Sequence, residues 1–201
     1  MESTEQQAKA INKFSEKYKN AGNNQQNGNG NSANGTQNNM NQQNYNPPQE
    51  ISEREVFIKI YVGETGVGKS YLASALGHQA CIKGYKVLYY NMSKLFTTLK
   101  MSKADNSYLK EITKIEKQHV LILDDFGLHP FDAINCMSLL EIIEDRHGKS
   151  STIIASQVPV NKWHELLGEK TLADAILDRI IHSSTRMELQ GDSMRKKQIQ
   201  K

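Results

Sequence analysis

The sequence is poor in the features that mark membrane, secreted and disulfide-bonded proteins. Only 2 of its 201 residues are cysteine. Cys81 and Cys136 are too few and too far apart for a disulfide framework or a zinc site, so both are expected to be buried, reduced thiols. The longest aliphatic run, residues 120–123, is far shorter than the ~20 residues that a membrane-spanning helix needs. The first residues lack the apolar core of a secretory signal, so we expect a cytoplasmic protein with no membrane partner.

Aliphatic side chains are missing from one stretch of the chain. Residues 20–49 contain 12 Asn, 6 Gln and 4 Gly but no Val, Ile, Leu or Phe. Such a segment cannot bury enough apolar surface to fold, so residues 20–50 are predicted to be a disordered linker. Before it, residues 1–19 could form a short helix. After it, residues 51–190 have the length and composition of one globular domain, which excludes a two-domain enzyme.

Charge is nearly balanced except at the end of the chain. The whole chain has 25 basic and 22 acidic side chains, which give a net charge of +3. The last 16 residues contain 5 basic and 2 acidic side chains and so account for this excess. Residues 191–201 therefore form a basic C-terminal tail. Such a tail can bind a phosphate backbone by releasing counterions, or it can be a solvated terminus.

Short apolar runs alternate with helical patterns from residue 56 onward. The predicted strands are 56–62, 86–91, 119–125, 151–156 and 185–189. The predicted helices are 69–83, 93–100, 103–117, 131–147, 161–167 and 171–181. This alternation predicts an α/β fold with a mostly parallel sheet, covered by helices on both faces in three layers.

The strongest motif is a phosphate-binding loop of the form G-x-x-x-x-G-K-[ST]. It consists of Gly63, Glu64, Thr65, Gly66, Val67, Gly68, Lys69 and Ser70. A predicted strand precedes it and a helix follows, so that backbone N–H groups and the helix N-terminus can surround a polyphosphate. The loop predicts ATP and Mg²⁺ as cofactors. Lys69 would reach the β- and γ-phosphates, and the Ser70 hydroxyl would ligate Mg²⁺.

Two adjacent carboxylates form a second motif. Asp124 and Asp125 follow the apolar run 120–123 at the carboxyl end of a predicted strand, where nucleotide sites lie in open α/β sheets. Asp124 is expected to hold Mg²⁺, and Asp125 to orient or deprotonate the attacking water. The alternative for Asp125 is a carboxylate that caps a turn or a helix. The chain has no N-K-x-D motif and no LSGGQ-like segment, which disfavours a GTPase and a transporter ATPase.

These segments together resemble the IstB-type ATPases, helper proteins of bacterial insertion-sequence transposition that are similar to DnaC-like helicase loaders. The resemblance rests on GETGVGKSYLASALGHQACIKGYKVLYY, HVLILDDFG, STIIASQVPVNKW, LADAILDRIIHSS and ELQGDSMRKK, in this order. It covers about residues 56–197. It implies an AAA+ P-loop ATPase with a five-stranded sheet of order 5-1-4-3-2, in agreement with the element order above.

The resemblance implies three further site residues. Gln157 stands where the family usually has an asparagine that contacts the γ-phosphate, and its side chain is one methylene longer. Arg179 matches an arginine finger that acts on the ATP of a neighbouring subunit. From its helical spacing alone, Arg179 would be a surface arginine paired with Asp174 or Asp178. Arg195 matches the sensor-2 arginine of the same nucleotide pocket.

The resemblance also implies partners, namely non-specific double-stranded DNA, a transposase and further copies of the chain. Six lysines between residues 92 and 118, against three acids, could follow a DNA backbone or form an ordinary solvated face. They are Lys94, Lys100, Lys103, Lys110, Lys114 and Lys117.

The function that follows is a slow, assembly-dependent ATPase that regulates a transposase on DNA. One alternative is a DnaC-like replicative helicase loader, and another is an ATP-binding remnant that does not hydrolyse ATP. Family members carry a helical domain ahead of the ATPase core, whereas this chain has the Asn/Gln/Gly segment there. We therefore expect either a truncated or rearranged copy of a mobile-element gene or a variant with a flexible tether.

Overall fold

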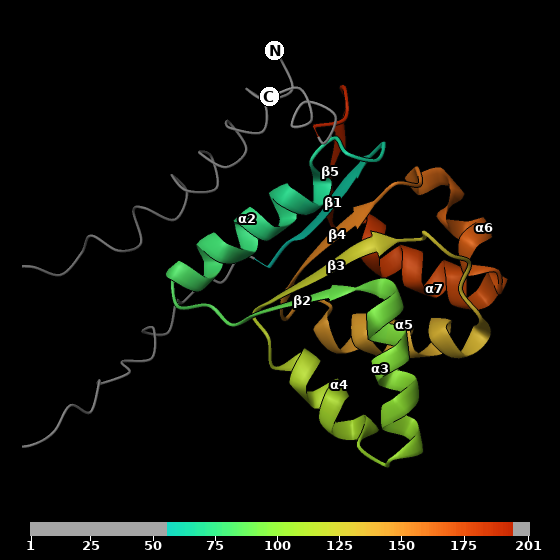
Figure 1. Cartoon of the computed structure of the whole chain (residues 1–201). Helices are drawn as coiled ribbons and strands as arrows, with labels where there is room; N and C mark the ends of the chain where they lie inside the picture. Colours follow the sequence, from blue (N-terminus) through green and yellow to red (C-terminus); the bar gives the residue numbers. More distant parts are fainter. Residues whose placement is uncertain (1–55, 195–201) are drawn as a thin grey trace, which may run out of the picture.

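Residues 56–194, which the computed structural model describes, form one sheet with helices on both faces (Figure 1). The strands are β1 (Ile58–Gly63), β2 (Val87–Asn91), β3 (Val120–Phe126), β4 (Ser151–Ser156) and β5 (Ser184–Leu189). The helices are α2 (Lys69–Ile82), α3 (Met92–Ala104), α4 (Tyr108–Glu116), α5 (Ala133–Arg146), α6 (Trp163–Leu167) and α7 (Lys170–Ile181), with a 3-10 turn, η1 (Val160–Lys162), before α6. Every predicted element of this region is present. The predictions for residues 1–50 and for most of the tail lie outside the described residues.

All five strands run parallel, in the order β2-β3-β4-β1-β5. This is the expected order 5-1-4-3-2, counted from the opposite edge. β1 lies between β4 and β5, with Ile58 opposite both Thr152 and Ser184. In a parallel sheet the carboxyl ends of all strands lie at the same edge, so the loops after β1, β3 and β4 meet there.

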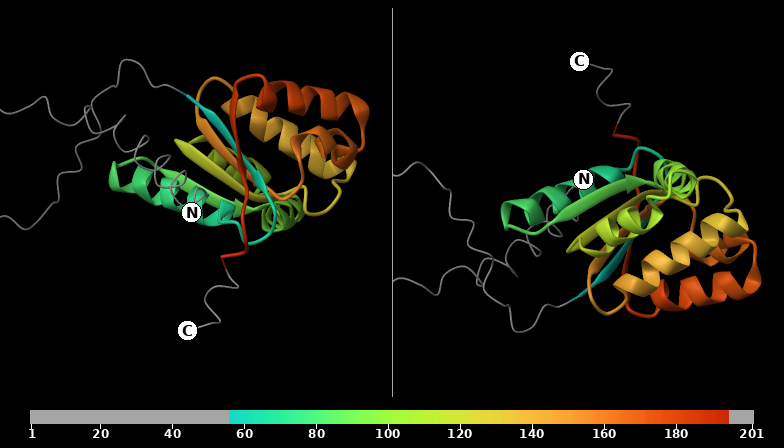
Figure 2. Two further views of the ribbon diagram at one scale, coloured as in Figure 1. Left: turned by 90° about the horizontal axis from the view of Figure 1, so that it is seen from above. Right: turned by 90° about the horizontal axis from the view of Figure 1, so that it is seen from below.

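Alternate residues of β3 belong to the two different faces of the sheet. Leu121 and Leu123 pack into an apolar core shared with α3 to α7, whereas Val120 and Ile122 pack against α2. Figure 2 shows the same division, with α2 on one face and α5 and α7 on the other. Burying each of these aliphatic side chains contributes roughly 1.5–3 kcal/mol, and this two-sided core fixes the sheet edge on which the loops converge.

Trp163 and Cys136 lie in the core of the protein, whereas Cys81 does not. Trp163 is fully buried, and its ring centroid lies 4.4 Å from that of Phe126, so it packs the start of α6 against the end of β3. Cys136 is buried as predicted, but Cys81 is exposed, so the prediction of two buried thiols was wrong. Since Ala80 faces the sheet from α2, the next residue, about 100° further around the helix, points to solvent.

A sharp turn separates α3 from α4. Asn106 adopts a left-handed backbone conformation with φ of 60°. The Asp105 carboxylate accepts hydrogen bonds from the N–H (3.0 Å) and the hydroxyl (2.5 Å) of Ser107. Such bonds between a short polar side chain and the backbone two residues on are typical of turns. The predicted helix 103–117 was therefore wrong at its start, because α3 continues to Ala104 and α4 begins only at Tyr108.

Arg146 is a buried cation that joins three elements. Its Nη1 donates to the carbonyls of Ile115 (2.8 Å) and Gln118 (2.9 Å), at the end of α4. Its Nη2 donates to the carbonyl of Ser151 (2.6 Å), at the start of β4. Burial lowers the pKa of the guanidinium to about 10, so it is still charged at neutral pH. Arg146 thus supplies the donors that these buried carbonyls need.

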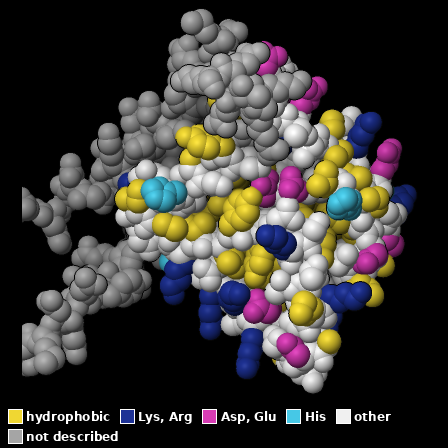
Figure 3. Space-filling view, in the orientation of Figure 1, with side chains coloured by type: hydrophobic (Ala, Val, Ile, Leu, Met, Phe, Trp, Pro, Cys, Tyr) yellow, Lys and Arg dark blue, Asp and Glu magenta, His cyan; other side chains and the backbone are white. Residues whose placement is uncertain are grey.

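Lysines gather on one face of α4. Lys110, Lys114 and Lys117 follow a helical spacing of four and three residues and line a shallow hollow of about 450 Å³. In Figure 3 dark blue side chains collect in the lower part of the molecule, around α3 and α4. Lys103 is engaged differently, since its Nζ donates to the Ser138 hydroxyl (3.0 Å) and lies 4.6 Å from the centre of the Tyr108 ring. Within residues 56–194, no helix combines the length and the apolar character needed to cross a membrane.

Candidate nucleotide-binding site

The phosphate-binding loop connects β1 to α2 and requires glycine at two close approaches. A Cβ on Gly63 would lie 2.2 Å from the carbonyl oxygen of Leu189. A Cβ on Gly66, whose φ is +88°, would lie 2.2 Å from the Ser193 hydroxyl oxygen. Any larger residue at these positions would clash, and at Gly66 it would also be strained. The glycines of the motif thus let the loop fold tightly against β5 and the segment after it.

Lys69 and the start of α2 supply positive charge to the loop. The Lys69 side chain is buried, and its Nζ donates to the carbonyls of Gly63 and Glu64, both at 2.7 Å. Lys69 and Ser70 are the first two residues of α2, where the backbone N–H groups carry a partial positive charge. The lysine and the helix N-terminus therefore lie at the same loop, which is the arrangement that an anion-binding site requires. Phosphate binding by this loop stays a prediction.

Asp124 lies at the carboxyl end of β3 with both carboxylate oxygens held. It is 4% exposed. Its Oδ1 accepts from the backbone N–H of Asp125 (2.9 Å), and its Oδ2 accepts from the hydroxyl of Tyr89 on β2. Burial and the hydrogen bond to Asp124 raise the pKa of Tyr89, so the hydroxyl keeps its proton and is a permanent donor. The sequence did not point to Tyr89, which orients this carboxylate.

Asp125 differs from its neighbour in backbone and in partner. Its φ is 56°, and the register between β3 and β4 shifts between Leu123 and Phe126, as in a β-bulge. Its carboxylate accepts from Asn91 Nδ2 (2.6 Å), at the end of β2. Helix capping, the alternative role for Asp125, falls to other residues, because the N-caps of α3 and α5 are Asn91 and Asp132.

The donor set suits magnesium together with a nucleotide. The Ser70 hydroxyl and the Asp124 carboxylate are the oxygen ligands that Mg²⁺ prefers. In the part of the chain that the structure describes, no group of three or more His, Cys, Asp or Glu side chains could hold a metal on its own. With a nucleotide bound, Mg²⁺ would complete its shell with phosphate oxygens and water, as is usual for this ion.

Gln157 reaches the phosphate-binding loop despite its extra methylene. It follows Ser156, the last residue of β4, and its Oε1 accepts a hydrogen bond from the Thr65 hydroxyl at 2.6 Å. The structure therefore brings Gln157 together with the loop, as the family resemblance implied. Its contact with a γ-phosphate stays a prediction.

The segment after β5 also lies on the loop. The backbone N–H of Met194 donates to the carbonyl of Gly66 at 2.9 Å. The next residue, Arg195, lies outside the described residues, so its role in the pocket stays a prediction. Ser193 and Met194 were not foreseen, because their contact with the loop depends on the pairing of β5 with β1.

Arg179 contacts α5 rather than the loop of its own chain. Its Nη1 donates to the carbonyl of Ala175 (2.8 Å), and its Nη2 pairs with Glu144 (2.7 Å). The alternative prediction, that Arg179 pairs with Asp174 or Asp178, was therefore wrong, because Arg179 pairs with Glu144. Those two aspartates pair with His164 and His182. The arginine-finger role, which concerns a neighbouring subunit, stays a prediction.

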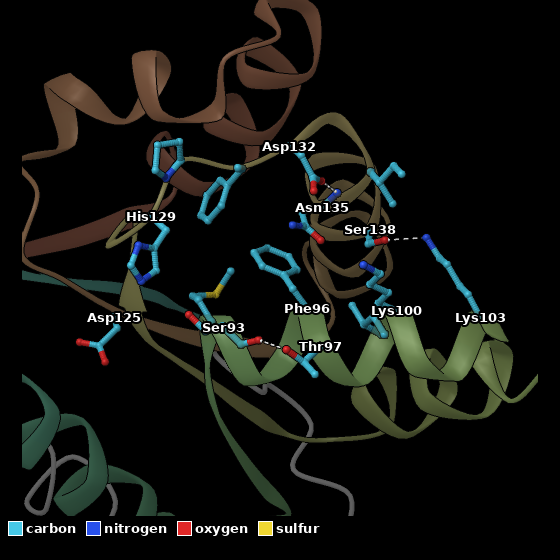
Figure 4. A pocket seen from close by; sticks show the side chains of 15 residues that line it. Ser93, Phe96, Thr97, Lys100, Lys103, Asp125, His129, Asp132, Asn135 and Ser138 are labelled. Atoms are coloured by element: carbon cyan, nitrogen blue, oxygen red, sulfur yellow. Dashed lines mark hydrogen bonds between the residues drawn. The ribbon is translucent and has the colours of Figure 1, made fainter. Parts of the chain in front are cut away.

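A cavity of about 460 Å³ lies between α3 and α5, beside the carboxylate pair. Phe96 and Phe131 line its apolar part, and Lys100 lies at its rim (Figure 4). Figure 4 shows Asp125 at one end, with its carboxylate directed away from the middle of the cavity. Asp125 thus lies at the border of this cavity without directing its carboxylate into it.

Comparisons with known proteins agree with this geometry. The family described as IstB-like ATP binding protein matches residues 52–201. An insertion sequence ATP-binding protein of Sinorhizobium fredii is 48% identical over 139 residues, which cover 69% of this chain and 57% of that protein. The insertion sequence IS21 ATP-binding protein of Pseudomonas aeruginosa is 35% identical over 142 residues, 71% of this chain and 54% of its own length. The chain thus spans little more than half the length of these relatives.

Solved structures share the fold. DnaI has a TM-score of 0.58 at 25% identity, with 67% of this chain and 73% of that chain covered. The replication initiator DnaA, bound to AMPPCP and single-stranded DNA, has a TM-score of 0.59 at 19% identity, with 69% and 42% covered. The DnaC helicase loader has a TM-score of 0.55 at 21% identity, with 67% and 78% covered. These likenesses indicate a common P-loop AAA+ fold.

Proposed function

Because the chain belongs to the family of IstB-like ATP-binding proteins, we propose that it is a Mg²⁺-dependent ATPase that assists the transposition of a DNA insertion sequence. The observation that carries this proposal is that Lys69, Asp124 and Asp125 all lie at the carboxyl edge of the parallel sheet. A phosphate-binding cation, a carboxylate for the metal and a second carboxylate for water are the groups that ATP hydrolysis requires.

Each group has a distinct task in the proposed reaction. The loop and Lys69 would bind the phosphates. Ser70 and Asp124 would hold Mg²⁺, which would supply charge neutralisation at the phosphates. Asp125 orients the attacking water and accepts its proton, while the amide of Asn91 holds the carboxylate in place. Gln157, which directly follows β4, and Arg195 are proposed to contact the phosphates.

Hydrolysis is proposed to depend on assembly of several copies, because Arg179 would complete the site of a neighbour. The Arg179 side chain is 30% exposed and that of Glu144 is 49% exposed. An ion pair this accessible contributes about 1 kcal/mol or less, so Arg179 can leave Glu144 for a phosphate on another subunit. An arginine supplied in this way couples turnover to assembly.

Double-stranded DNA is the proposed platform for assembly. Lys110, Lys114 and Lys117 present three cations on one face of α4, which suits a phosphate backbone and reads no bases. The relatives are insertion sequence ATP-binding proteins, and from this we propose that the ATP state regulates a partner transposase. Since DNA is a proposed partner, we propose that the protein acts in the cytoplasm.

A replicative helicase loader is the second candidate, favoured by the fold shared with DnaI and with the DnaC helicase loader. The two functions predict different partners. A transposition helper should assemble on double-stranded DNA without a helicase, whereas a loader should bind a replicative helicase without duplex DNA. Sedimentation of the protein with each partner distinguishes them.

ATP hydrolysis with Mg²⁺, measured with and without duplex DNA over a range of protein concentrations, tests the proposed function. We expect DNA to stimulate turnover, turnover per subunit to rise with protein concentration, and both effects to vanish in Arg179→Ala. ATP binding without turnover under any of these conditions would contradict the proposal and indicate an ATP-binding remnant.

A further inference from the structure

Thr65 joins the phosphate-binding loop to the strand end that carries Gln157. The Thr65 hydroxyl donates a hydrogen bond of 2.6 Å to Gln157 Oε1, across 92 positions of sequence. The two residues meet because β1 and β4 are adjacent and parallel, with Val62 opposite Ser156. Each residue lies just beyond its strand, at the edge where the carboxylates also lie.

We infer that Thr65 is a positioning residue, which orients the Gln157 amide so that its Nε2 donates to the γ-phosphate of ATP; this rests on the proposed role of Gln157. A glutamine amide has one accepting end and one donating end of nearly equal shape. Phosphate oxygens only accept hydrogen bonds, so the donating end alone is useful there. By donating to Oε1, Thr65 occupies the accepting end and directs Nε2 away from itself.

The extra methylene of Gln157 explains why a second attachment matters. Glutamine has one more rotatable bond than asparagine, so fixing its amide costs more side-chain entropy. Gln157 is half-buried and Thr65 is exposed, which leaves the amide room to rotate about its terminal bond. A hydrogen bond from the loop restricts that rotation before the nucleotide binds. Since ADP has no γ-phosphate, the pair should favour ATP over ADP.

Binding measurements on the full chain test the inference. The variant Thr65→Val keeps the branched shape and removes the hydroxyl. The dissociation constants of AMPPCP and ADP, each with Mg²⁺, are measured by displacement of a fluorescent nucleotide. Since one hydrogen bond is removed, we expect the preference for AMPPCP over ADP, taken as the ratio of their dissociation constants, to fall about fivefold. The ratio cancels any change in affinity that the variant causes for both nucleotides alike. Thr65→Ser retains a hydroxyl and should retain most of the preference.

A double-mutant cycle separates orientation of Gln157 from a direct effect of Thr65. In a Gln157→Ala background, Thr65→Val should have no further effect on the preference, because there is no amide left to orient. Additive effects, equal weakening of both nucleotides, or no change in Thr65→Val would each overturn the inference. A wild-type protein that binds ATP without hydrolysing it would contradict the proposed ATPase activity and leave this test valid.

Discussion

At the carboxyl edge of the sheet, residues of β2 hydrogen-bond to the two carboxylates of β3 and orient them. Asp124 and Asp125 are adjacent and chemically identical, yet Tyr89 holds the first and Asn91 the second. Tyr89 and Asn91 lie two residues apart on β2, and each donates a hydrogen bond to one of the two carboxylates. Asp124, which is buried, is proposed to bind the metal. Asp125, whose backbone is left-handed, is proposed to orient the attacking water.

The variant Asp125→Asn should bind ATP and fail to hydrolyse it. Asparagine tolerates the left-handed conformation that this position requires, so the loop is expected to keep its shape. Loss of a general base lowers turnover by about 10²- to 10⁴-fold. Turnover and equilibrium binding of a fluorescent ATP analogue check this. The exposed Asp174→Asn is the matched control, and turnover near that of the wild type in Asp125→Asn would contradict the assignment.

The sequence revealed the loop and both carboxylates, because their spacing and their place after apolar runs are local signals. It did not reveal Tyr89, Ser193 or Met194, whose contacts depend on which strands pair and in what register. Asn91 could have been found, since a polar residue at the end of the strand next to β3 must lie at the same edge. Tyr89 gave no such signal within an apolar strand.

Helices and strands could be predicted from the sequence wherever the spacing of apolar residues distinguishes one from the other. All five strands and their order followed from the alternation of apolar runs and helical patterns, together with the family resemblance. The α3–α4 boundary did not, because Lys103 and Lys110 have a helical spacing that continues through the turn. The signal that was missed is Asp105 and Asn106, two residue types that favour turns.

At the scale of elements, Arg146→Met should destabilise the whole sheet. The change would leave the carbonyls of Ile115, Gln118 and Ser151 without the donors that the guanidinium supplies. We expect the free energy of unfolding to fall by about 3 kcal/mol or more, measured by urea denaturation. The exposed Arg186→Met removes the same charge as a control. An equally small decrease in both variants would rule out this role.

The lysine face of α4 should carry much of the affinity for duplex DNA. Replacing Lys110, Lys114 and Lys117 by Gln should weaken binding at low salt, because fewer counterions are released. The slope of log K against log salt should become shallower by roughly 0.9 for each DNA phosphate that the variant no longer neutralises. Fluorescence anisotropy of a labelled duplex measures both quantities.

A second triple variant, with Gln at the exposed Lys149, Lys162 and Lys170, changes the net charge equally and lies on other elements. If it weakens DNA binding as much as the α4 variant, net charge and not the face of α4 determines affinity.

A single copy of the chain is proposed to lack one group that ATP hydrolysis needs. Its Arg179 would act on the ATP of a neighbouring copy and not on the ATP in its own phosphate-binding loop. Arg179 belongs to α7, on the opposite face of the sheet from α2, and the two helices contribute to separate apolar cores (Figure 2). A head-to-tail arrangement would bring the α7 side of one copy to the loop of the next.

Mixing two inactive variants tests this arrangement. Arg179→Ala keeps an intact Asp125, and Asp125→Asn keeps an intact Arg179, so some interfaces of a mixed assembly are complete. With random association in equal amounts, about a quarter of the interfaces should be active, and turnover should recover to that fraction of the wild type. Each variant alone is the control. No recovery in the mixture would contradict a finger supplied by a neighbour.

The position of β1 in the sheet has a consequence for how the protein is made. Among the described strands β1 is the first to leave the ribosome, yet its two neighbours, β4 and β5, are the last. In a nascent chain that ends before residue 151, neither β4 nor β5 is present to pair with β1. The phosphate-binding loop would then follow an unpaired strand. Domains with such long-range pairing complete their folding late. Nucleotide binding would therefore mark the completion of synthesis, and unfinished chains would not compete for ATP.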